Sequence, residues 1–320
     1  MSATAAHLLT GKLITLFGGG GFLGRHAAQA LMQAGARVRI VQRDPKRAFA
    51  VKALGNLGQM QFVAADAGDA EAVRKAASGS DAVVNLIGIL KGDFPRAHVT
   101  TAVNIAEAAA ASGAAMVQIS AIGAAADSAS AYGRSKYAGE AKVRMALPEA
   151  IILRPSIVFG REDGFINRFA GMIRMAPVVP VVAPNTKFQP VFVGDVAEAI
   201  VAALSDPAAH AGQTYELGGP QAISMRALLE WIGSKIGRSP LLIDVPDFAA
   251  AALASGTGWL PGAPITRDQW AMLGRDNVVA PGAHTLADLG VVPTPLDAVA
   301  EGWLDIYRRH GRFGGKAATA

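Results

Sequence analysis

Over the first half of the chain, short apolar runs rich in branched residues alternate with longer stretches whose apolar positions recur every three or four residues. The short runs predict strands and the longer stretches predict helices. The expected strands are 13–17, 37–42, 61–64, 82–86, 116–119 and 150–153. The expected helices are 23–33, 46–54, 70–77, 96–111 and 131–147. Strands separated by single helices need right-handed crossovers, so the pattern predicts an α/β fold with a doubly wound parallel sheet.

The pattern is less regular after Arg154. Residues 190–206 and 212–220 predict a strand, a helix and a further strand that return to the first sheet. Residues 224–237 predict an amphipathic helix capped by Ser224, and 295–310 predict a last helix. We therefore expect a first domain over 11–160 and a smaller, partly interleaved C-terminal lobe over 161–320, with about 189–218 returning to the first sheet.

Composition excludes several kinds of function. Of the 320 residues, 51% are apolar and 17% are charged, which is typical of a globular chain. With no cysteine there is no disulfide scaffold and no thiolate nucleophile, and a reducing, cytoplasmic setting is favoured. The net charge of +5 is scattered, so we expect no nucleic-acid partner. The six histidines lack metal-ligand spacing, so we expect no metal site and place most of them at the surface or at helix caps.

The longest uncharged run is 248–266, which contains glycines and prolines that would break a membrane-spanning helix. It is a candidate for peripheral contact with a membrane or a partner. The alternative is that it forms a small core of the C-terminal lobe.

Glycines at Gly18, Gly21 and Gly24 follow the first expected strand and open the first expected helix. In such a motif the first glycine makes a tight turn, the second lets a pyrophosphate approach the backbone, and the third lets the helix pack on the strand. The helix start at Phe22 and Leu23 offers free N–H groups to the anion. The motif predicts a Rossmann-type NAD(P)-binding domain, with Gly19 and Gly20 as interchangeable spacers.

In such domains a residue at the end of the second strand normally contacts the adenosine ribose. An acidic residue there binds the 2′-hydroxyl of NAD, whereas an arginine accommodates the 2′-phosphate of NADP. The segment "VQRDPKR" places Arg43 there, with Lys46 and Arg47 behind it, and Arg25 follows Gly24. Several cations favour NADP(H) over NAD(H). A shift of one residue would instead make Asp44 the ribose ligand.

Further cofactor contacts are expected after the later strands. Asp66 is placed to meet the adenine, or alternatively to cap the next helix. Asn85 and Gly88 would lie beside the nucleotide. Pro155 follows Arg154 where the nicotinamide should lie, and we expect Arg154 to fix the loop rather than to bind substrate.

Tyr132 and Lys136 are four residues apart and therefore share one face of the expected helix 131–147. A tyrosine beside a lysine is a workable proton donor for carbonyl reduction, because the ammonium favours the phenolate and can also hold the nicotinamide ribose.

The segments "FGGGGFLG", "YGRSK" and "LRPSIVFG" together resemble the extended or atypical short-chain dehydrogenase/reductases. The resemblance implies that Tyr132 is the catalytic acid/base, that Lys136 orients ribose and lowers the tyrosine pKa, and that a serine after the fifth strand binds the substrate oxygen. Ser120 is present, but Ala121 and Ile122 stand where the extended enzymes carry that serine. Catalysis would then be weakened by about 10²–10³ in rate or absent, unless Ser128 or Ser130 substitutes.

The segments "QPVFVGDVAEAI", "YELGGP" and "PITRDQW…APGAHTLADLGVVPTPLD…YRRH" are similar to the NADPH-binding accessory subunit of respiratory complex I and its bacterial relatives, over about 11–312. This implies a tightly held nucleotide, complex I subunits or quinone-pathway proteins as partners, and a peripheral place on the inner face of a bacterial inner membrane. The alternative is an active NAD(P)-dependent oxidoreductase or epimerase using Tyr132 and Lys136 on a hydrophobic carbonyl, quinone-like or sugar-nucleotide substrate. Whether the protein is an enzyme stays open at this point.

Overall fold

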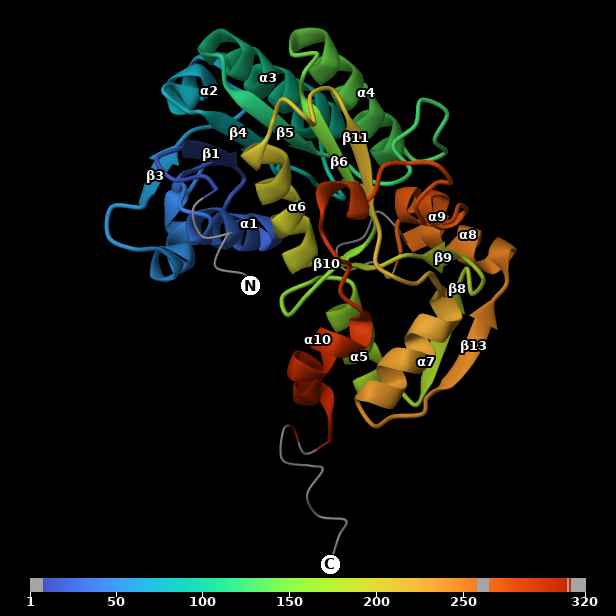
Figure 1. Ribbon diagram of the computed structural model, residues 1–320. Helices are drawn as coiled ribbons and strands as arrows, with labels where there is room; N and C mark the ends of the chain where they lie inside the picture. Colours follow the sequence, from blue (N-terminus) through green and yellow to red (C-terminus); the bar gives the residue numbers. More distant parts are fainter. Residues whose placement is uncertain (1–7, 258–264, 310, 312–320) are drawn as a thin grey trace, which may run out of the picture. The chain divides into compact units, whose positions relative to one another are not determined.

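A computed structural model describes residues 8–257, 265–309 and 311 (Figure 1). The chain divides into two compact units. The first unit is made of 1–155, 193–217 and 280–292, and the second of 156–192, 218–279 and 293–320.

The first unit is built on a seven-stranded sheet in the order β11-β6-β5-β4-β1-β2-β3. Its strands are β1 (Leu13–Phe17), β2 (Arg37–Gln42), β3 (Met60–Ala64), β4 (Ala82–Asn85), β5 (Ala115–Ile119), β6 (Ile151–Pro155) and β11 (Thr214–Leu217). Every neighbouring pair is parallel. All carboxyl ends therefore lie along one edge of the sheet, which is where such folds place their ligands.

Helices cover both faces of this sheet (Figure 1). The helical elements of the first unit are α1 (Phe22–Gln33), η2 (Pro45–Leu54), α2 (Ala70–Ala77), η3 (Pro95–Thr100), α3 (Thr101–Ser112), α4 (Ala131–Ala146), α6 (Val193–Ser205) and η4 (Ala287–Leu289). Helices α1 and α6 pack together on one face, and α2, α3 and α4 follow one another on the other. Phe17, Val83, Ile105, Met116 and Val143 are fully buried between the sheet and α2–α4. The predicted doubly wound parallel fold is confirmed.

Three expected elements differ from the observed ones. Residues 45–54 form a 3₁₀ helix, and the helix expected from 96 begins as a π-helical turn before α3. The expected strand near 191 is a two-residue strand, β10 (Val191–Phe192). It pairs with β7 (Val158–Phe159) in the second unit and does not return to the large sheet, which corrects that part of the prediction. Helix α6 and strand β11 do join the first unit.

The second unit combines three two-stranded sheets with short helices. Besides β7 and β10, its strands are β8 (Val178–Val182), β9 (Lys187–Phe188), β12 (Ile223–Ser224) and β13 (Leu241–Val245). Its helices are α5 (Ile166–Met175), α7 (Met225–Lys235), α8 (Asp247–Thr257), α9 (Arg267–Leu273), α10 (Leu296–Leu304) and η5 (Asp305–Tyr307). The core gathers Phe159, Ile166, Leu228 and Trp303. As predicted, Ser224 caps α7, because its side chain accepts the N–H of Ala227 at 3.2 Å.

The apolar run 248–266 is only partly described, since 258–264 lie outside the described residues. In α8, Ala250 and Ala254 are buried, whereas 78% of Phe248 is exposed. None of the helices in the described part of the chain has both the length and the apolar character that a membrane span needs. A contact role for this run stays a prediction.

Candidate functional site

The glycine-rich turn after β1 is shaped by close backbone packing. Gly18 has a φ of +85°, which favours glycine. A Cβ at Gly24 would lie 2.6 Å from the carbonyl oxygen of Gly18, so α1 can approach the turn only with glycine there. The N–H of Gly21 donates to the same carbonyl at 3.1 Å, and α1 begins at Phe22. The first-turn N–H groups at Phe22 and Leu23 therefore open toward the carboxyl edge of the sheet.

Gly19 and Gly20 are not interchangeable spacers, which corrects the sequence-based expectation. A Cβ at Gly19 would lie 3.0 Å from the Cβ of Leu16. A Cβ at Gly20 would overlap the side-chain oxygen of Gln42 and lie 2.9 Å from the Cβ of Ala48. Gln42 accepts the N–H of Gly20 at 3.1 Å, so the end of β2 holds the glycine turn.

The expected adenosine end carries exposed cations. Arg43, Lys46 and Arg47 are all exposed. Asp44 caps η2, because its carboxylate accepts the N–H of Lys46 at 3.1 Å. Arg25 is half-buried, and its Nε donates to the carbonyl of Gly21 at 3.4 Å, which places it beside the glycine turn.

Asp66 follows β3 but does not cap the next helix, which corrects one of its two expected roles. Its carboxylate accepts the N–H of Gly68 at 2.9 Å and a guanidinium N–H of Arg96 at 2.8 Å. The cap of α2 is Asp69 instead. The signal for Asp69 was available in the sequence, because it directly precedes the helical pattern.

A chain of polar contacts links the ends of β4 and β5 to α4. Buried Asn85 accepts the N–H of Ile87 at 3.0 Å and donates to the side-chain oxygen of Gln118 at 2.9 Å. Gln118 donates to the carbonyl of Ile119 at 3.0 Å, and Lys136 Nζ donates to that carbonyl at 3.2 Å. Gln118 was not among the predicted site residues. The sequence did contain a signal for it, because it is a polar residue inside the apolar strand β5.

Gly88 and Lys136 come together at the same edge. A Cβ at Gly88 would lie 3.3 Å from Lys136 Nζ, so a larger residue there would crowd the ammonium. These contacts bring the loop after β4 against the lysine of α4, as a site spanning both elements requires.

Burial dominates the acidity of the tyrosine–lysine pair. Lys136 Nζ lies 5.9 Å from the centre of the Tyr132 ring. Burial lowers the pKa of Lys136 to about 8, partly opposed by Glu140. Burial raises the pKa of Tyr132 to about 12. This direction is opposite to the one expected from the lysine, because burial of the phenol is the cause of the shift.

The three candidate serines differ in their contacts. Ser130 caps α4 by accepting the N–H of Gly133 at 2.9 Å, and Ser128 Oγ lies 3.3 Å from Ser130 Oγ. Ser120 is 3% exposed, and its hydroxyl has no hydrogen-bond partner in the described part of the chain. A buried unpaired hydroxyl is costly, so Ser120 is the serine best able to bind a ligand.

Arg154 is fully engaged by protein carboxylates. It bonds both oxygens of Glu140, and its Nη1 lies 3.6 Å from Glu216 on β11. These contacts support the expectation that Arg154 fixes structure rather than substrate. Pro155 ends β6, and its carbonyl accepts the N–H of Ile122 at 3.0 Å.

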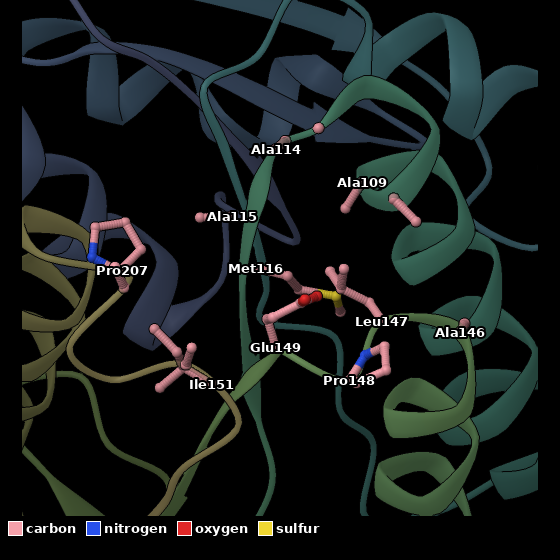
Figure 2. A pocket seen from close by; sticks show the side chains of 14 residues that line it. Ala109, Ala114, Ala115, Met116, Ala146, Leu147, Pro148, Glu149, Ile151 and Pro207 are labelled. Carbon is pink, nitrogen blue, oxygen red and sulfur yellow. The ribbon is translucent and has the colours of Figure 1, made fainter.

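A separate groove of about 650 Å³ lies at the amino ends of β5 and β6, the opposite edge from the glycine turn (Figure 2). Met116, Leu147, Pro148 and Glu149 line it together with several alanines. None of the predicted site residues lines it. Within the residues that the structure describes, no three His, Cys, Asp or Glu side chains gather as a metal site.

A glycine turn that feeds a helix N-terminus at the first strand of a doubly wound sheet is the arrangement of dinucleotide-binding domains. The chain belongs to the NAD-dependent epimerase/dehydratase family, an NAD(P)-binding family whose model matches residues 14–218. The predicted membership of the short-chain dehydrogenase/reductase class is thereby confirmed.

The comparisons also confirm the predicted relationship to complex I subunits. The chain is 36% identical over 314 residues to the mitochondrial NADH dehydrogenase (ubiquinone) 1 alpha subcomplex subunit 9 of Mus musculus, covering 95% of this chain and 82% of the relative. It is 30% identical over 260 residues to a ceramide reductase of Caulobacter vibrioides, covering 79% and 80%. An NADPH-dependent quinone oxidoreductase of Escherichia coli, solved with NADPH, matches with a TM-score of 0.74 at 21% identity over 91% of this chain and 99% of that one, which shows the shared fold.

Proposed function

We propose that the first unit binds NADP(H) along the carboxyl edge of its sheet, with the pyrophosphate on the glycine turn. The single observation that carries this proposal is the turn itself, where Gly18 has a positive φ and where Gly20 and Gly24 leave no room for side chains at the start of α1. Such a turn lets phosphate oxygens reach backbone N–H groups and the positive end of the helix.

The other predicted residues take complementary parts in this proposal. Arg43, Lys46 and Arg47 face the 2′-phosphate and favour NADP(H) over NAD(H), because guanidinium and ammonium groups match a dianion. Asp66 lies toward the adenine. Asn85, Gly88 and Pro155 border the nicotinamide half. Lys136 donates a hydrogen bond to the nicotinamide ribose. A hydrogen bond from its Nζ to the carbonyl of Ile119 already holds the ammonium at the edge of the sheet.

We further propose that the nucleotide is a tightly held cofactor of a protein that associates with respiratory complex I or with quinone-linked proteins. The similarity to the mouse NADH dehydrogenase subunit over 95% of this chain supports this partner class. In this proposal the protein is cytoplasmic and peripheral on the inner face of a bacterial inner membrane, with 248–266 as its contact.

Two measurements test these proposals. Denaturing the purified protein should release NADP(H) in about a one-to-one ratio, identified by mass spectrometry, and a Gly24→Ala variant purified in parallel should carry none. Detergent-solubilised membranes of the native host should yield complex I subunits together with the tagged protein. Protein that carries NADP(H) but does not co-purify with complex I subunits would contradict the proposed partner and leave the proposed cofactor in place. Protein that carries no nucleotide would contradict the proposed cofactor.

The second candidate function is carbonyl reduction. The unpaired, buried hydroxyl of Ser120 favours it, because an oxyanion needs such a donor, and so does the ceramide reductase among the relatives. When bound, the nucleotide would supply a hydride to the carbonyl carbon. Tyr132, protonated at neutral pH, would give its hydroxyl proton to the carbonyl oxygen, so that the product is an alcohol.

The decay of nicotinamide fluorescence on adding ketones, quinones or nucleotide sugars tests this second function. Turnover should be lost in Tyr132→Phe by about 10²–10⁴-fold, while the nucleotide dissociation constant stays nearly unchanged. Turnover that survives in Tyr132→Phe would exclude Tyr132 as the proton donor.

A further inference from the structure

His98 is buried inside the first unit, whereas most of the histidines were expected at the surface or at helix caps. Only 3% of it is exposed, and it lies in the π-helical turn η3 between the loop after β4 and helix α4. Single π-helical turns often occur at functional sites, and the histidine is the one residue of η3 that is buried.

The hydrogen bonds of His98 fix one tautomer of its ring. Nε2 accepts the backbone N–H of Ile89 at 3.1 Å, so it carries no proton. Nδ1 lies 2.8 Å from Ser135 Oγ, whose single proton is donated to the carbonyl of Tyr132 at 2.8 Å. Ser135 must therefore accept from His98, which requires a neutral ring with the proton on Nδ1.

Aromatic contacts hold the same ring from two further sides. Phe94 stacks on it at 5.4 Å with an interplanar angle of 13°. Tyr132 meets it edge-on at 5.4 Å and 90°. A Cβ at Gly139 would overlap the backbone carbonyl of His98, so α4 approaches η3 as closely as it does only because glycine stands there.

We propose that His98 is a positioning residue that locks the loop 86–89 against helix α4. The loop carries Gly88, whose Cα faces Lys136 Nζ, and the next residue, Ile89, is the one that His98 holds. The same imidazole ring contacts the ring of Tyr132 edge-on. It also hydrogen-bonds Ser135, whose hydroxyl donates to the backbone carbonyl of Tyr132. His98 thus couples the two halves of the candidate site, and in this respect the inference rests on the proposed function.

The electrostatic setting keeps this lock closed at neutral pH. Burial is the main cause that lowers the pKa of His98 to about 4, and the nearby Lys136 ammonium lowers it further. The ring therefore stays neutral, and Nε2 stays an acceptor, throughout the physiological range.

Two readouts that need no nucleotide test the lock in the full-length protein. Nitrogen-15 NMR of the imidazoles should show His98 with the proton on Nδ1, the less common tautomer of free histidine. Hydrogen exchange should find the Ile89 amide protected, and His98→Leu should speed its exchange by at least about tenfold, as expected for one lost hydrogen bond. A proton on Nε2, or unchanged Ile89 exchange in His98→Leu, would overturn the proposal.

Nucleotide affinity tests the coupling to the site. His98→Leu should weaken NADPH binding by about tenfold or more, whereas His98→Gln, whose amide can accept from Ile89 and donate to Ser135, should recover most of it. His284→Leu, at an exposed histidine of the same unit, should leave binding unchanged. Equal affinities for His98→Leu and the wild type would overturn the coupling. Should the wild type itself not bind NADP(H), the proposed cofactor fails, while the tautomer and exchange results still decide the lock.

Discussion

Arg154 grips Glu140 through two parallel hydrogen bonds, Nε to Oε1 at 2.9 Å and Nη2 to Oε2 at 2.6 Å. The Glu140 side chain is 6% exposed and the Arg154 side chain 22%, so both charges have lost most of their water. Glu216 on β11 faces the same guanidinium and also accepts the N–H of Ala280 at 2.8 Å. One ion cluster therefore ties α4, β6, β11 and the segment 280–292 together within the first unit.

Breaking this cluster should be costly. Glu140→Ala should lower the free energy of unfolding by about 3 kcal/mol, because it strands a largely buried guanidinium with one weaker partner. Arg74→Ala, which removes a solvent-exposed ion pair with Glu71, should cost far less, because water already solvates both charges. Urea unfolding followed by far-UV circular dichroism would compare the two. Equal small losses would mean that the cluster is solvated in solution.

The glycine turn yields a second prediction. Gly20→Ala and Gly24→Ala should each weaken NADPH binding strongly and lower the melting temperature, because the added methyl group meets the Cβ of Ala48 and the side chain of Gln42 in the first variant and the backbone of Gly18 in the second. Gly302→Ala is the matched control, since a Cβ there meets nothing within 4 Å and the residue is an exposed helical position in α10. That control should be neutral or stabilising by about 0.5–1 kcal/mol. Fluorescence titration and thermal unfolding measure both effects, and normal NADPH binding by Gly24→Ala would remove the turn from the site.

The strands and the glycine spacing could be predicted from the sequence because both are local signals. The spacing of apolar positions and the β-branched residues predict both ends of β1 and β2 correctly. The spacing of Gly18, Gly21 and Gly24 predicts the turn. The crowding at Gly19 and Gly20 could not be predicted, because it depends on side chains from β1, β2 and η2.

The burial of polar residues could not be predicted from the sequence either. An isolated histidine such as His98 gives no local sign that a loop N–H, a serine and two aromatic rings will surround it. The partner of β10 was also hidden, since a two-residue strand carries too little pattern to choose between sheets. Each of these features depends on chain segments that meet only in the folded state.

Cofactor preference gives a third prediction. Arg43→Ala should weaken NADPH binding by about 1.5–3 kcal/mol, the value of a hydrogen bond to a charged group, and leave NADH binding almost unchanged. Asp44→Ala should act differently, because Asp44 caps η2: it should cost about 0.5–2 kcal/mol of stability without changing the preference. Calorimetric titration with both nucleotides decides the matter. An equal loss for NADPH and NADH in Arg43→Ala would point to Asp44 as the ribose ligand.

The buried ammonium of Lys136 gives a fourth prediction, about pH. Its pKa falls from 10.5 in the unfolded chain to about 8 in the folded protein because of burial. Between pH 8 and 10.5 this lysine therefore binds more protons in the unfolded chain, and its own contribution to the stability of the folded state must rise with pH across that window. Below pH 8 the full penalty for burying the charged ammonium applies, on the order of 3 kcal/mol for a shift of this size.

The variant Lys136→Met tests this prediction. It lacks the penalty, so its stability relative to the wild type should be greatest at pH 7 and should decline as the pH approaches 10. Lys142→Met, at an exposed position on the same helix, should run parallel to the wild type. Urea unfolding at pH 7, 8, 9 and 10 measures all three proteins, and a constant difference between Lys136→Met and the wild type would show that Lys136 keeps its water in the folded state.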